Sequence, residues 1–268
     1  MSAPLSITSE QNAKIKLVRR LRSKRGRAIA RRFVVDYQRD LQRALRCGYA
    51  IDFLLHSPEI AAAPPLDQVE IFQVTPQLLK RVSYRENPAG MIAVLHSRPA
   101  KGLLDLVDAG PNHVLVLVNL SVPGNVGALL RTADAAGIDA VILVDSALDL
   151  YNPNIIRSST GACFRDNVYQ LGSDDALAYL RQHRFQIVAA AIDGASSLFE
   201  LEFGAKTAVA LGAEDSGLPE AWRSVADQLA RIPMAGGLAD SLNVSVCGAI
   251  LMYERYRQQD AATREKER

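Results

Sequence analysis

From His113 to about Arg257 the sequence alternates between apolar runs and helical segments, and this pattern constrains the fold more than any other feature. The run HVLVLVNL is apolar almost throughout, as in a parallel strand buried on both faces. AVILVD, DNVYQL, QIVAAAID, TAVALGAE and LARIPM follow as further strands. The expected helices cover 125–136, 152–163 and 241–257, with another behind Ser173. This alternation predicts an α/β domain with a parallel sheet covered by helices on both faces.

The 268 residues leave room for a second, smaller domain before this sheet. Residues 31–97 contain four short apolar strands and two amphipathic helices, which predicts a small α/β unit. Pro99, Gly102 and Gly110 interrupt the pattern. We therefore expect a basic N-terminal arm at 1–30, a small domain at 31–97, a linker at 98–111 and the parallel-sheet domain at 112–268.

The net charge of +2 hides an asymmetry, because residues 1–46 carry +10 and the remainder carries −8. Dense cationic residues with few acids among them suit a nucleic-acid backbone, where each neutralised phosphate releases counterions. The simpler alternative is a solvated helix face without a partner. The predicted RNA contacts are Lys14, Lys16, Arg19, Arg20, Arg22, Lys24, Arg25, Arg27, Arg31 and Arg32.

Several classes of protein are disfavoured. No apolar run approaches the length of a membrane-spanning helix, and the basic N-terminus precedes no apolar signal segment. Cys47, Cys163 and Cys247 are odd in number and form no CxxC pair, so we expect no disulfide framework, no metal and a reducing, cytoplasmic setting.

Three loops follow apolar strands and carry polar residues. NLSVPGNVGALLRTADAAG at 119–137 contains Asn125, which we expect to cap a helix, and Arg131; ALGAEDSGLPE at 210–220 contains Glu214. RIPMAGGLADSLNVSV at 231–246 breaks at Gly236 and Gly237 and restarts as a helix behind the N-cap residues Asp240 and Ser241. Because ligands bind at the carboxyl ends of parallel strands, we expect these loops to form one site.

In their order and spacing the three motifs resemble those of the SpoU family of RNA ribose 2′-O-methyltransferases, in the SPOUT superfamily. The resemblance implies a deep trefoil knot, S-adenosylmethionine as methyl donor and a homodimer with sites near the subunit interface. More loosely, ITSEQNAKIK and SYRENPAGMIAV resemble the L30e-like RNA-binding domain of many SpoU relatives, although Asp36 and Tyr37 replace the usual Glu-Gly.

The resemblance also implies residue roles. The expected catalytic residues are Asn125, Arg131, Glu214, Ser241 and Asn243. The expected cofactor contacts are Leu211, Gly212, Glu214, Gly217, Ile232, Met234, Leu242 and Asn243. Ala213 and Asp215 depart from the family pattern, which usually has Asn and Gly there.

The expected activity is therefore methyl transfer to a ribose 2′-hydroxyl of structured RNA, with 23S-type rRNA preferred to tRNA. A guanidinium is a hydrogen-bond donor only and a difficult base, so we expect Arg131 to clamp a phosphate and stabilise the developing alkoxide. Two alternatives are a catalytically silent RNA-binding or assembly factor of the same fold and a small-molecule nucleotide-binding enzyme on a conventional doubly wound sheet.

Overall fold

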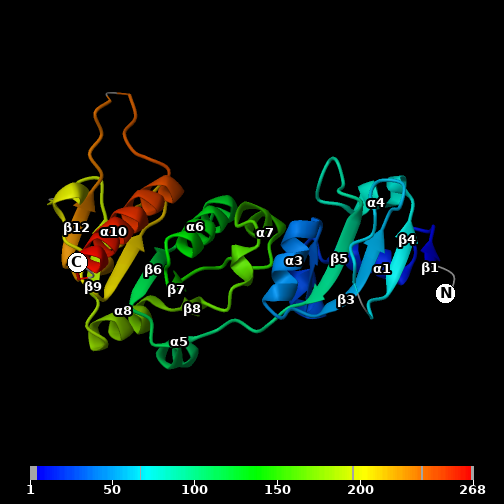
Figure 1. Ribbon diagram of the computed structural model, residues 1–268, viewed down its shortest axis with the longest axis horizontal. Coiled ribbons are helices and arrows are strands. Elements are labelled where there is room, and N and C mark those ends of the chain that lie inside the picture. Colours follow the sequence, from blue (N-terminus) through cyan, green and yellow to red (C-terminus); the bar gives the residue numbers. More distant parts are fainter. Residues whose placement is uncertain (1–4, 67, 195, 237, 267–268) are drawn as a thin grey trace. The chain divides into compact units, whose positions relative to one another are not determined.

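The computed structural model describes residues 5–66, 68–194, 196–236 and 238–266, and it divides into two compact units (Figure 1). Unit 1 is formed by the described residues up to Pro99 together with Asp149–Phe164. Unit 2 is formed by Ala100–Leu148 and the described residues from Arg165 onward. No helix in the described part of the chain is long and apolar enough to cross a bilayer.

Unit 1 is built on a five-stranded mixed sheet in the order β1-β4-β3-β5-β2. Its strands are β1 (Leu5–Ile7), β2 (Arg32–Val35), β3 (Ile51–His56), β4 (Ile71–Val74) and β5 (Met91–His96), and its first four helices are α1 (Ala13–Arg20), α2 (Lys24–Ala30), α3 (Gln38–Arg46) and α4 (Pro76–Val82). Strand β3 pairs in parallel with β4 and antiparallel with β5. The strands and helices predicted between residues 31 and 97 are thereby confirmed.

The basic N-terminal segment is not a separate arm. Ile15 and Val18 of α1, with Leu21 behind it, are buried in the hydrophobic core of unit 1. The apolar residues between the cations therefore serve unit 1 itself, and β1 extends its sheet by pairing with β4.

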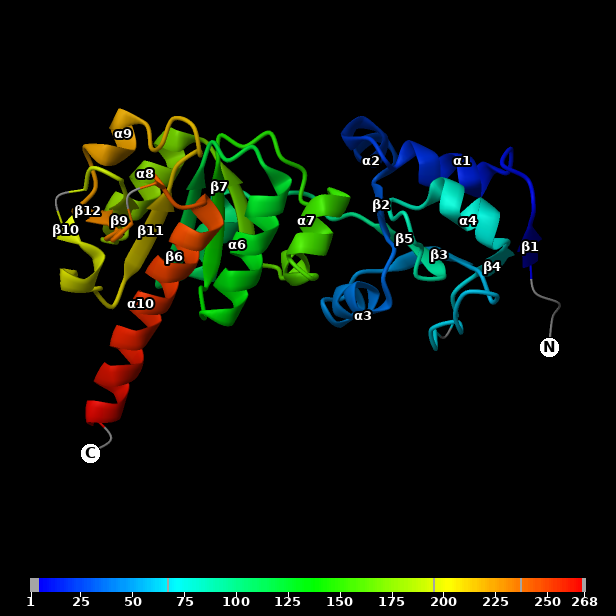
Figure 2. The ribbon, with the colours of Figure 1, turned by 90° about the horizontal axis from the view of Figure 1, so that it is seen from above.

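Unit 2 contains the predicted parallel sheet, which is confirmed and has seven strands in the order β10-β12-β9-β11-β6-β7-β8. The strands are β6 (His113–Val118), β7 (Ala140–Val144), β8 (Val168–Leu171), β9 (Gln186–Ala190), β10 (Ser196–Ser197), β11 (Thr207–Leu211) and β12 (Gln228–Arg231). The helices are α5 (Leu103–Ala109), α6 (Pro123–Ala135), α8 (Ser173–Gln182), α9 (Glu220–Arg223) and α10 (Val244–Lys266), with a short 3-10 turn η2 (Leu198–Glu200). Figure 2 shows α6 and α10 on one face of the sheet and α8 and α9 on the other.

Helix α5 lies inside the segment that the sequence predicts as a linker. Leu106 is fully buried in the core of unit 2. The glycines that interrupt the apolar pattern mark the ends of this helix: the Gly102 backbone N–H donates to Asp105 Oδ2 at 2.8 Å, and Gly110 ends the helix at a φ of 55°. The linker prediction is wrong from Leu103 to Ala109.

The segment Asp149–Phe164 packs in unit 1, although the sequence assigned it to the parallel-sheet domain. It contains α7 (Pro153–Ser158) and the 3-10 turn η1 (Ala162–Phe164) in place of the single helix predicted at 152–163. The helix stops because Thr160 and Gly161 adopt φ values of 52° and 87°, which reverse the chain. Tyr151 of this segment stacks on Phe33 with ring centroids 4.5 Å apart.

Candidate active site

The three predicted motif loops lie at the carboxyl ends of parallel strands of unit 2. The first leaves β6 after Val118 and enters α6, the second leaves β11 after Leu211, and the third leaves β12 after Arg231 and enters α10. All strands of this sheet run in the same direction, so the loops share one edge. This is the edge at which open α/β sheets bind ligands.

Asn125 does not cap α6, contrary to the sequence prediction. The helix begins at Pro123, which suits a first helical position because it needs no backbone N–H there, and Val122 is the N-cap. Asn125 is consequently the third helical residue. Its side chain is free to reach outside the helix, where it donates from Nδ2 to Glu214 Oε1.

A chain of hydrogen bonds joins the three motifs. Asn243 Nδ2 donates to Asn125 Oδ1 at 3.2 Å, and Asn243 Oδ1 accepts from the Ser245 backbone N–H at 2.9 Å and from the Ser245 hydroxyl at 2.6 Å. The Ser245 N–H fixes which end of the Asn243 amide is the oxygen, and this in turn orients Asn125 with its NH₂ toward the Glu214 carboxylate. The hydrogen bonds therefore run in sequence from Glu214 through Asn125 and Asn243 to the first turn of α10.

Asn243 is also the residue that caps α10. It lies just before the first helical residue, Val244, and its side chain accepts from the backbone of the first turn. The predicted start behind Asp240 and Ser241 is therefore too early. Both residues are exposed and lie in the loop.

The second motif forms a turn that requires glycine at two positions. A Cβ at residue 212 would overlap the backbone of Gly217 and Leu218, and Gly217 itself has a φ of 67°. The Gly217 N–H donates to the Ala213 carbonyl at 2.9 Å. The exposed turn leaves the backbone N–H groups of residues 214–216 without a hydrogen-bond partner in the described part of the chain.

The other predicted cofactor contacts lie around this turn and in the third loop. Leu211 is buried, Ile232 and Leu242 are half-buried, and Met234 is 41 % exposed. Strand β12 ends at Arg231, three residues before the predicted end at Met234. Gly237, half of the predicted Gly-Gly turn, lies outside the described residues.

Arg131 and Ser241 stand apart from the hydrogen-bonded chain. Arg131 follows Asn125 by six residues, an advance of about 9 Å along α6. Both side chains are exposed, and neither makes a hydrogen bond or ion pair with any residue the structure describes. The structure thus brings together Asn125, Glu214 and Asn243 out of the five predicted catalytic residues.

Two residues that the sequence did not single out help to hold the site. Ser245 bonds to Asn243 through both its backbone and its hydroxyl. At Gly248 a Cβ would overlap Leu129 of α6, so the missing side chain lets α10 approach that helix closely. The only available sequence signal was the pair of small residues Gly248 and Ala249 within an apolar helical run.

Two of the three cysteines, Cys163 and Cys247, fit no nucleophilic role. Burial raises the pKa of the Cys163 thiol to about 12. Burial also raises the pKa of Cys247, whose thiol donates to the Leu242 carbonyl at 3.5 Å. Both therefore remain protonated near neutral pH. Among the described residues, no cluster of His, Cys, Asp and Glu has an arrangement that would hold a metal ion.

The predicted RNA-binding cations fall into two groups. Five are held by partners within unit 1: Lys14 by Glu70, Arg19 by Glu10, Arg22 by the Ser83 carbonyl, Arg27 by Asp149 and Arg32 by Asp52. Arg27 is buried and 2.6 Å from its carboxylate, so it is not available to a phosphate. Lys24 is exposed but has an interaction within the chain, whereas the side chains of Lys16, Arg20, Arg25 and Arg31 are exposed without a described partner.

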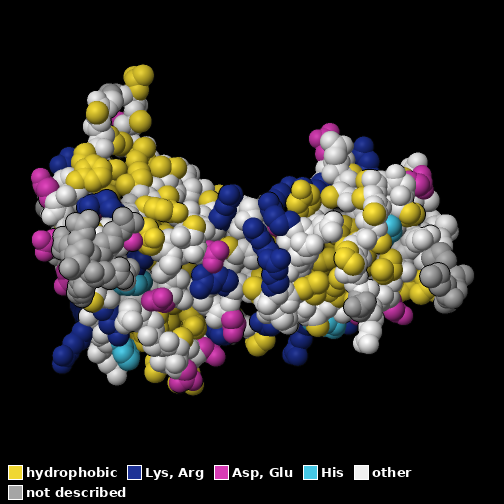
Figure 3. All heavy atoms as spheres, viewed as in Figure 1, with side chains coloured by type: hydrophobic (Ala, Val, Ile, Leu, Met, Phe, Trp, Pro, Cys, Tyr) yellow, Lys and Arg dark blue, Asp and Glu magenta, His cyan; other side chains and the backbone are white. Residues whose placement is uncertain are grey.

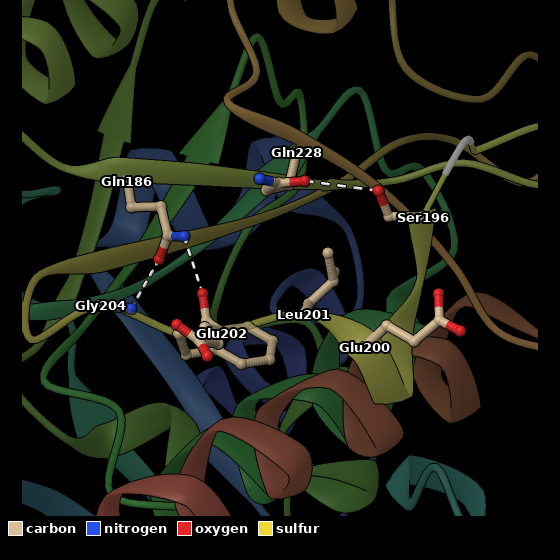
Figure 4. Close-up of a pocket in the computed structure, with 8 residues that line it drawn as sticks. Gln186, Ser196, Glu200, Leu201, Glu202, Gly204 and Gln228 are labelled. Carbon is tan, nitrogen blue, oxygen red and sulfur yellow. Dashed lines mark hydrogen bonds between the residues drawn. The ribbon is translucent and has the colours of Figure 1, made fainter.

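A cavity of about 560 Å³ lies elsewhere in unit 2, at the amino ends of β9 and β12 (Figure 4). Gln186 points into it, but its amide accepts from the Gly204 N–H at 2.7 Å and donates to the Glu202 carbonyl at 2.9 Å. None of the predicted site residues lines this cavity. It is therefore separate from the candidate active site.

Two family models match the chain. A family model described as the SpoU rRNA Methylase family matches residues 112–253, more than half of the chain, and one described as an MRM3-like substrate binding domain matches residues 12–93. The chain is 28 % identical over 248 residues to the 23S rRNA (guanosine(2553)-2′-O)-methyltransferase RlmP of Bacillus subtilis, covering 92 % of this chain and 97 % of that protein.

Solved structures are similar over nearly the whole chain. A crystal structure of an RNA 2′-O ribose methyltransferase superposes with a TM-score of 0.82 at 35 % identity, covering 95 % of this chain and 99 % of that one. An AdoMet-bound rRNA methyltransferase from Sinorhizobium meliloti superposes with a TM-score of 0.82 at 28 % identity, covering 94 % of this chain and 97 % of that one.

Proposed function

The chain belongs to the SpoU rRNA methylase family, and we propose that it transfers a methyl group from S-adenosylmethionine to a ribose 2′-hydroxyl of ribosomal RNA of the 23S type. The observation that carries the proposal is the hydrogen-bonded chain Glu214–Asn125–Asn243, which joins all three family motifs at one edge of the sheet. The names of the similar proteins support rRNA over tRNA as the substrate.

The proposed chemistry is an in-line transfer in which the 2′-hydroxyl must be positioned and must lose its proton. S-adenosylmethionine, when bound, supplies the activated methyl group on its sulfonium. Glu214, Asn125 and Asn243 present fixed acceptors and donors that orient the ribose. Arg131 clamps the adjacent phosphate and stabilises the developing alkoxide, and its exposed guanidinium, which has no partner among the described residues, supports this role.

We assign the cofactor to the turn at Gly212–Gly217 and to the loop that contains Ile232, Met234 and Leu242. The turn fits such a ligand because the backbone N–H groups of residues 214–216, beside buried Leu211, have no hydrogen-bond partner among the described residues. Backbone groups and an apolar wall are sufficient to hold the polar and apolar ends of a nucleoside derivative. The Ala213 and Asp215 departures leave this backbone cradle in place, because the contacts come from the main chain.

We also propose the finer features that the family resemblance implies. These are a trefoil knot in unit 2, an L30e-like fold for unit 1, and a cytoplasmic homodimer. Exposed apolar residues on α10 and in the loop before it, Met234, Leu238, Val246, Tyr253 and Tyr256, support a subunit interface there.

The test is to map ribose methylations in the ribosomal and transfer RNA of the host, with and without the protein. We expect one or a few 2′-O-methyl groups of 23S-type rRNA to be missing when the host lacks the protein. Loss of a tRNA methylation instead would reassign the substrate. A catalytically silent assembly factor would leave every methylation in place, and titration with S-adenosylmethionine would show no binding.

A further inference from the structure

Tyr37 of unit 1 is an exposed aromatic ring flanked by two arginines. It lies immediately before α3 and remains 39 % exposed. The guanidinium carbon of Arg85 is 4.8 Å from the centre of its ring, and that of Arg39 is 5.3 Å away. Figure 3 shows Lys and Arg side chains around α3, the helix that carries Arg39. An exposed aromatic ring with two guanidinium groups close to it offers flat surfaces on which a base can stack.

Carboxylates hold both guanidinium groups in place. Arg85 donates from Nε to Asp36 Oδ1 at 3.1 Å, and Arg39 donates from Nε to Asp40 Oδ1 at 3.0 Å, with Asp40 only 2 % exposed. Within the described residues, the two terminal nitrogens of Arg85 make no hydrogen bond, and Nη1 of Arg39 makes none either. The side chains are therefore oriented by the protein while donors remain for a ligand.

A second arginine–tyrosine pair adjoins this arrangement. Arg22 lies with its guanidinium carbon 5.2 Å from the centre of the Tyr84 ring, and Tyr84 precedes Arg85 in the chain. Tyr84 donates to the Leu21 carbonyl, and burial raises its pKa. Tyr84 is thus part of the packed structure, whereas the side chain of Tyr37 makes no hydrogen bond to a described residue and remains 39 % exposed.

We propose that Tyr37, Arg39 and Arg85 form a stacking site for an unpaired nucleotide of the RNA substrate. The proposal rests on the RNA-directed activity proposed above and adds where unit 1 grips that RNA. A base needs a flat, polarisable surface, and the phosphate beside it needs donors, which the two terminal nitrogens of Arg85 supply because no described residue bonds to them. Paired bases expose no face, so the site selects a loop, bulge or single strand over a duplex.

The experiment measures binding of RNA hairpins that carry 2-aminopurine at an unpaired loop position, together with a duplex of the same length. Tyr37→Ala should weaken hairpin binding about tenfold and abolish the fluorescence change that stacking causes. Tyr37→Phe should retain both, because the ring suffices. Binding of the duplex should not respond to either change.

Matched variants separate stacking from charge and from folding. Arg85→Gln should lower the slope of log hairpin affinity against log salt by about one, which corresponds to one phosphate contact. Tyr37→Ala should leave that slope unchanged. Ile60→Ala, at a residue of the same unit that is 40 % exposed, is the control and should match the parent. Thermal melting verifies that each variant is folded. If Tyr37→Ala is not folded, Tyr37→Leu is used in its place.

Three results would overturn the proposal: parental hairpin affinity in Tyr37→Ala, an equal loss in Tyr37→Phe, or an equal loss for the duplex. Because binding is measured without methyl transfer, these results leave the proposed methyltransferase activity untouched. Conversely, a protein that stacks the loop base through Tyr37 but methylates no RNA would refute the activity alone.

Discussion

The motif loops of unit 2 and the basic segment of unit 1 carry equally suggestive sequences, but the folded chain uses their polar groups differently. In unit 2, side chains from three distant motifs bond to one another at the edge of the sheet. In unit 1, five of ten predicted RNA-binding cations are held by acids or carbonyls of the unit itself. The polar groups of the first region thus meet in one site, whereas half of the predicted cations of the second region bind to other groups of unit 1.

The difference has a physical reason. Residues at the carboxyl ends of parallel strands meet because the topology brings them to one edge. Cations on short helices have no such constraint, and they pair with whatever carboxylate or carbonyl the packed unit offers. A motif at a strand end therefore predicts where its polar side chains lie. A count of cations overestimates how many of them remain available to RNA.

The largest effect should come from Gly212→Ala in the motif region. The new Cβ would meet backbone atoms of Gly217 and Leu218, which cannot rotate away as a side chain can. We expect the free energy of unfolding to fall by about 3 kcal/mol, the upper end for overpacking, and S-adenosylmethionine binding to be lost. Gly236→Ala is the matched control, since a Cβ there meets no atom within 4 Å. Cofactor binding by Gly212→Ala at parental affinity would contradict this account of the turn.

Replacement of Arg131 should abolish most activity without affecting the fold. Its guanidinium has no partner among the described residues, so Arg131→Ala should leave the melting temperature and cofactor affinity unchanged. The methyl-transfer rate should fall on the order of a hundredfold. Arg131→Lys should keep part of the rate and the parental pH dependence, because a positive charge remains near the alkoxide. A shifted pH profile in the lysine variant would instead favour a base at this position.

Changing the four exposed cations of unit 1 that have no partner among the described residues should weaken RNA binding alone. The quadruple variant with Gln at Lys16, Arg20, Arg25 and Arg31 should lose roughly ten- to a hundredfold in affinity at moderate salt, and the slope of log affinity against log salt should fall by about three. Cofactor affinity should not change. An unaltered slope would remove these residues from the RNA interface.

Arg27→Gln provides the contrast within the same segment. Arg27 is buried against Asp149, so its loss should lower the free energy of unfolding by about 3 kcal/mol while the salt slope of the folded protein stays parental. Chemical denaturation and RNA titration of the same sample compare the two quantities. A reduced slope in folded Arg27→Gln would place this residue in the interface after all.

The smallest expected effect distinguishes Asn243, which caps α10 in the structure, from Ser241, behind which the sequence predicts the start of the helix. Asn243→Ala removes the side chain that caps the helix and should lower the free energy of unfolding by about 1 kcal/mol. Ser241→Ala should change it by much less, because Ser241 is exposed and makes no hydrogen bond to a described residue. Urea denaturation of both variants decides the matter, and the reverse order would show that the helix begins earlier.

Most of the fold could be predicted from the sequence because its signals are local. Apolar runs such as HVLVLVNL indicate buried parallel strands, and the structure confirms the sheet that they imply. The boundaries were harder. The start of α10 depends on which of Asp240, Ser241 and Asn243 bonds to the first turn, and all three are residues that favour caps.

Long-range packing was not visible in the sequence. The stacking of Tyr151 on Phe33 places a segment between β7 and β8 in unit 1, and no local pattern at 149–164 indicates this. Similarly, the ion pair of Arg27 with Asp149 joins residues that are 122 positions apart. The basic segment consequently looked like a free arm, although Ile15 and Leu21 lie in the core of unit 1. Deletion of residues 1–30 would therefore remove part of that core.

The central claim is that unit 2 methylates a ribose hydroxyl, and the position of the transferred methyl group tests it most directly. Host rRNA that lacks the modification is incubated with the purified protein and S-adenosylmethionine carrying a radioactive methyl group, and the RNA is then hydrolysed in alkali. A 2′-O-methyl group blocks cleavage of the next phosphodiester bond, so we expect label in alkali-resistant dinucleotides, and about a hundredfold less of it with Arg131→Ala at equal times. Label recovered in mononucleotides would mean a methylated base and would contradict the account.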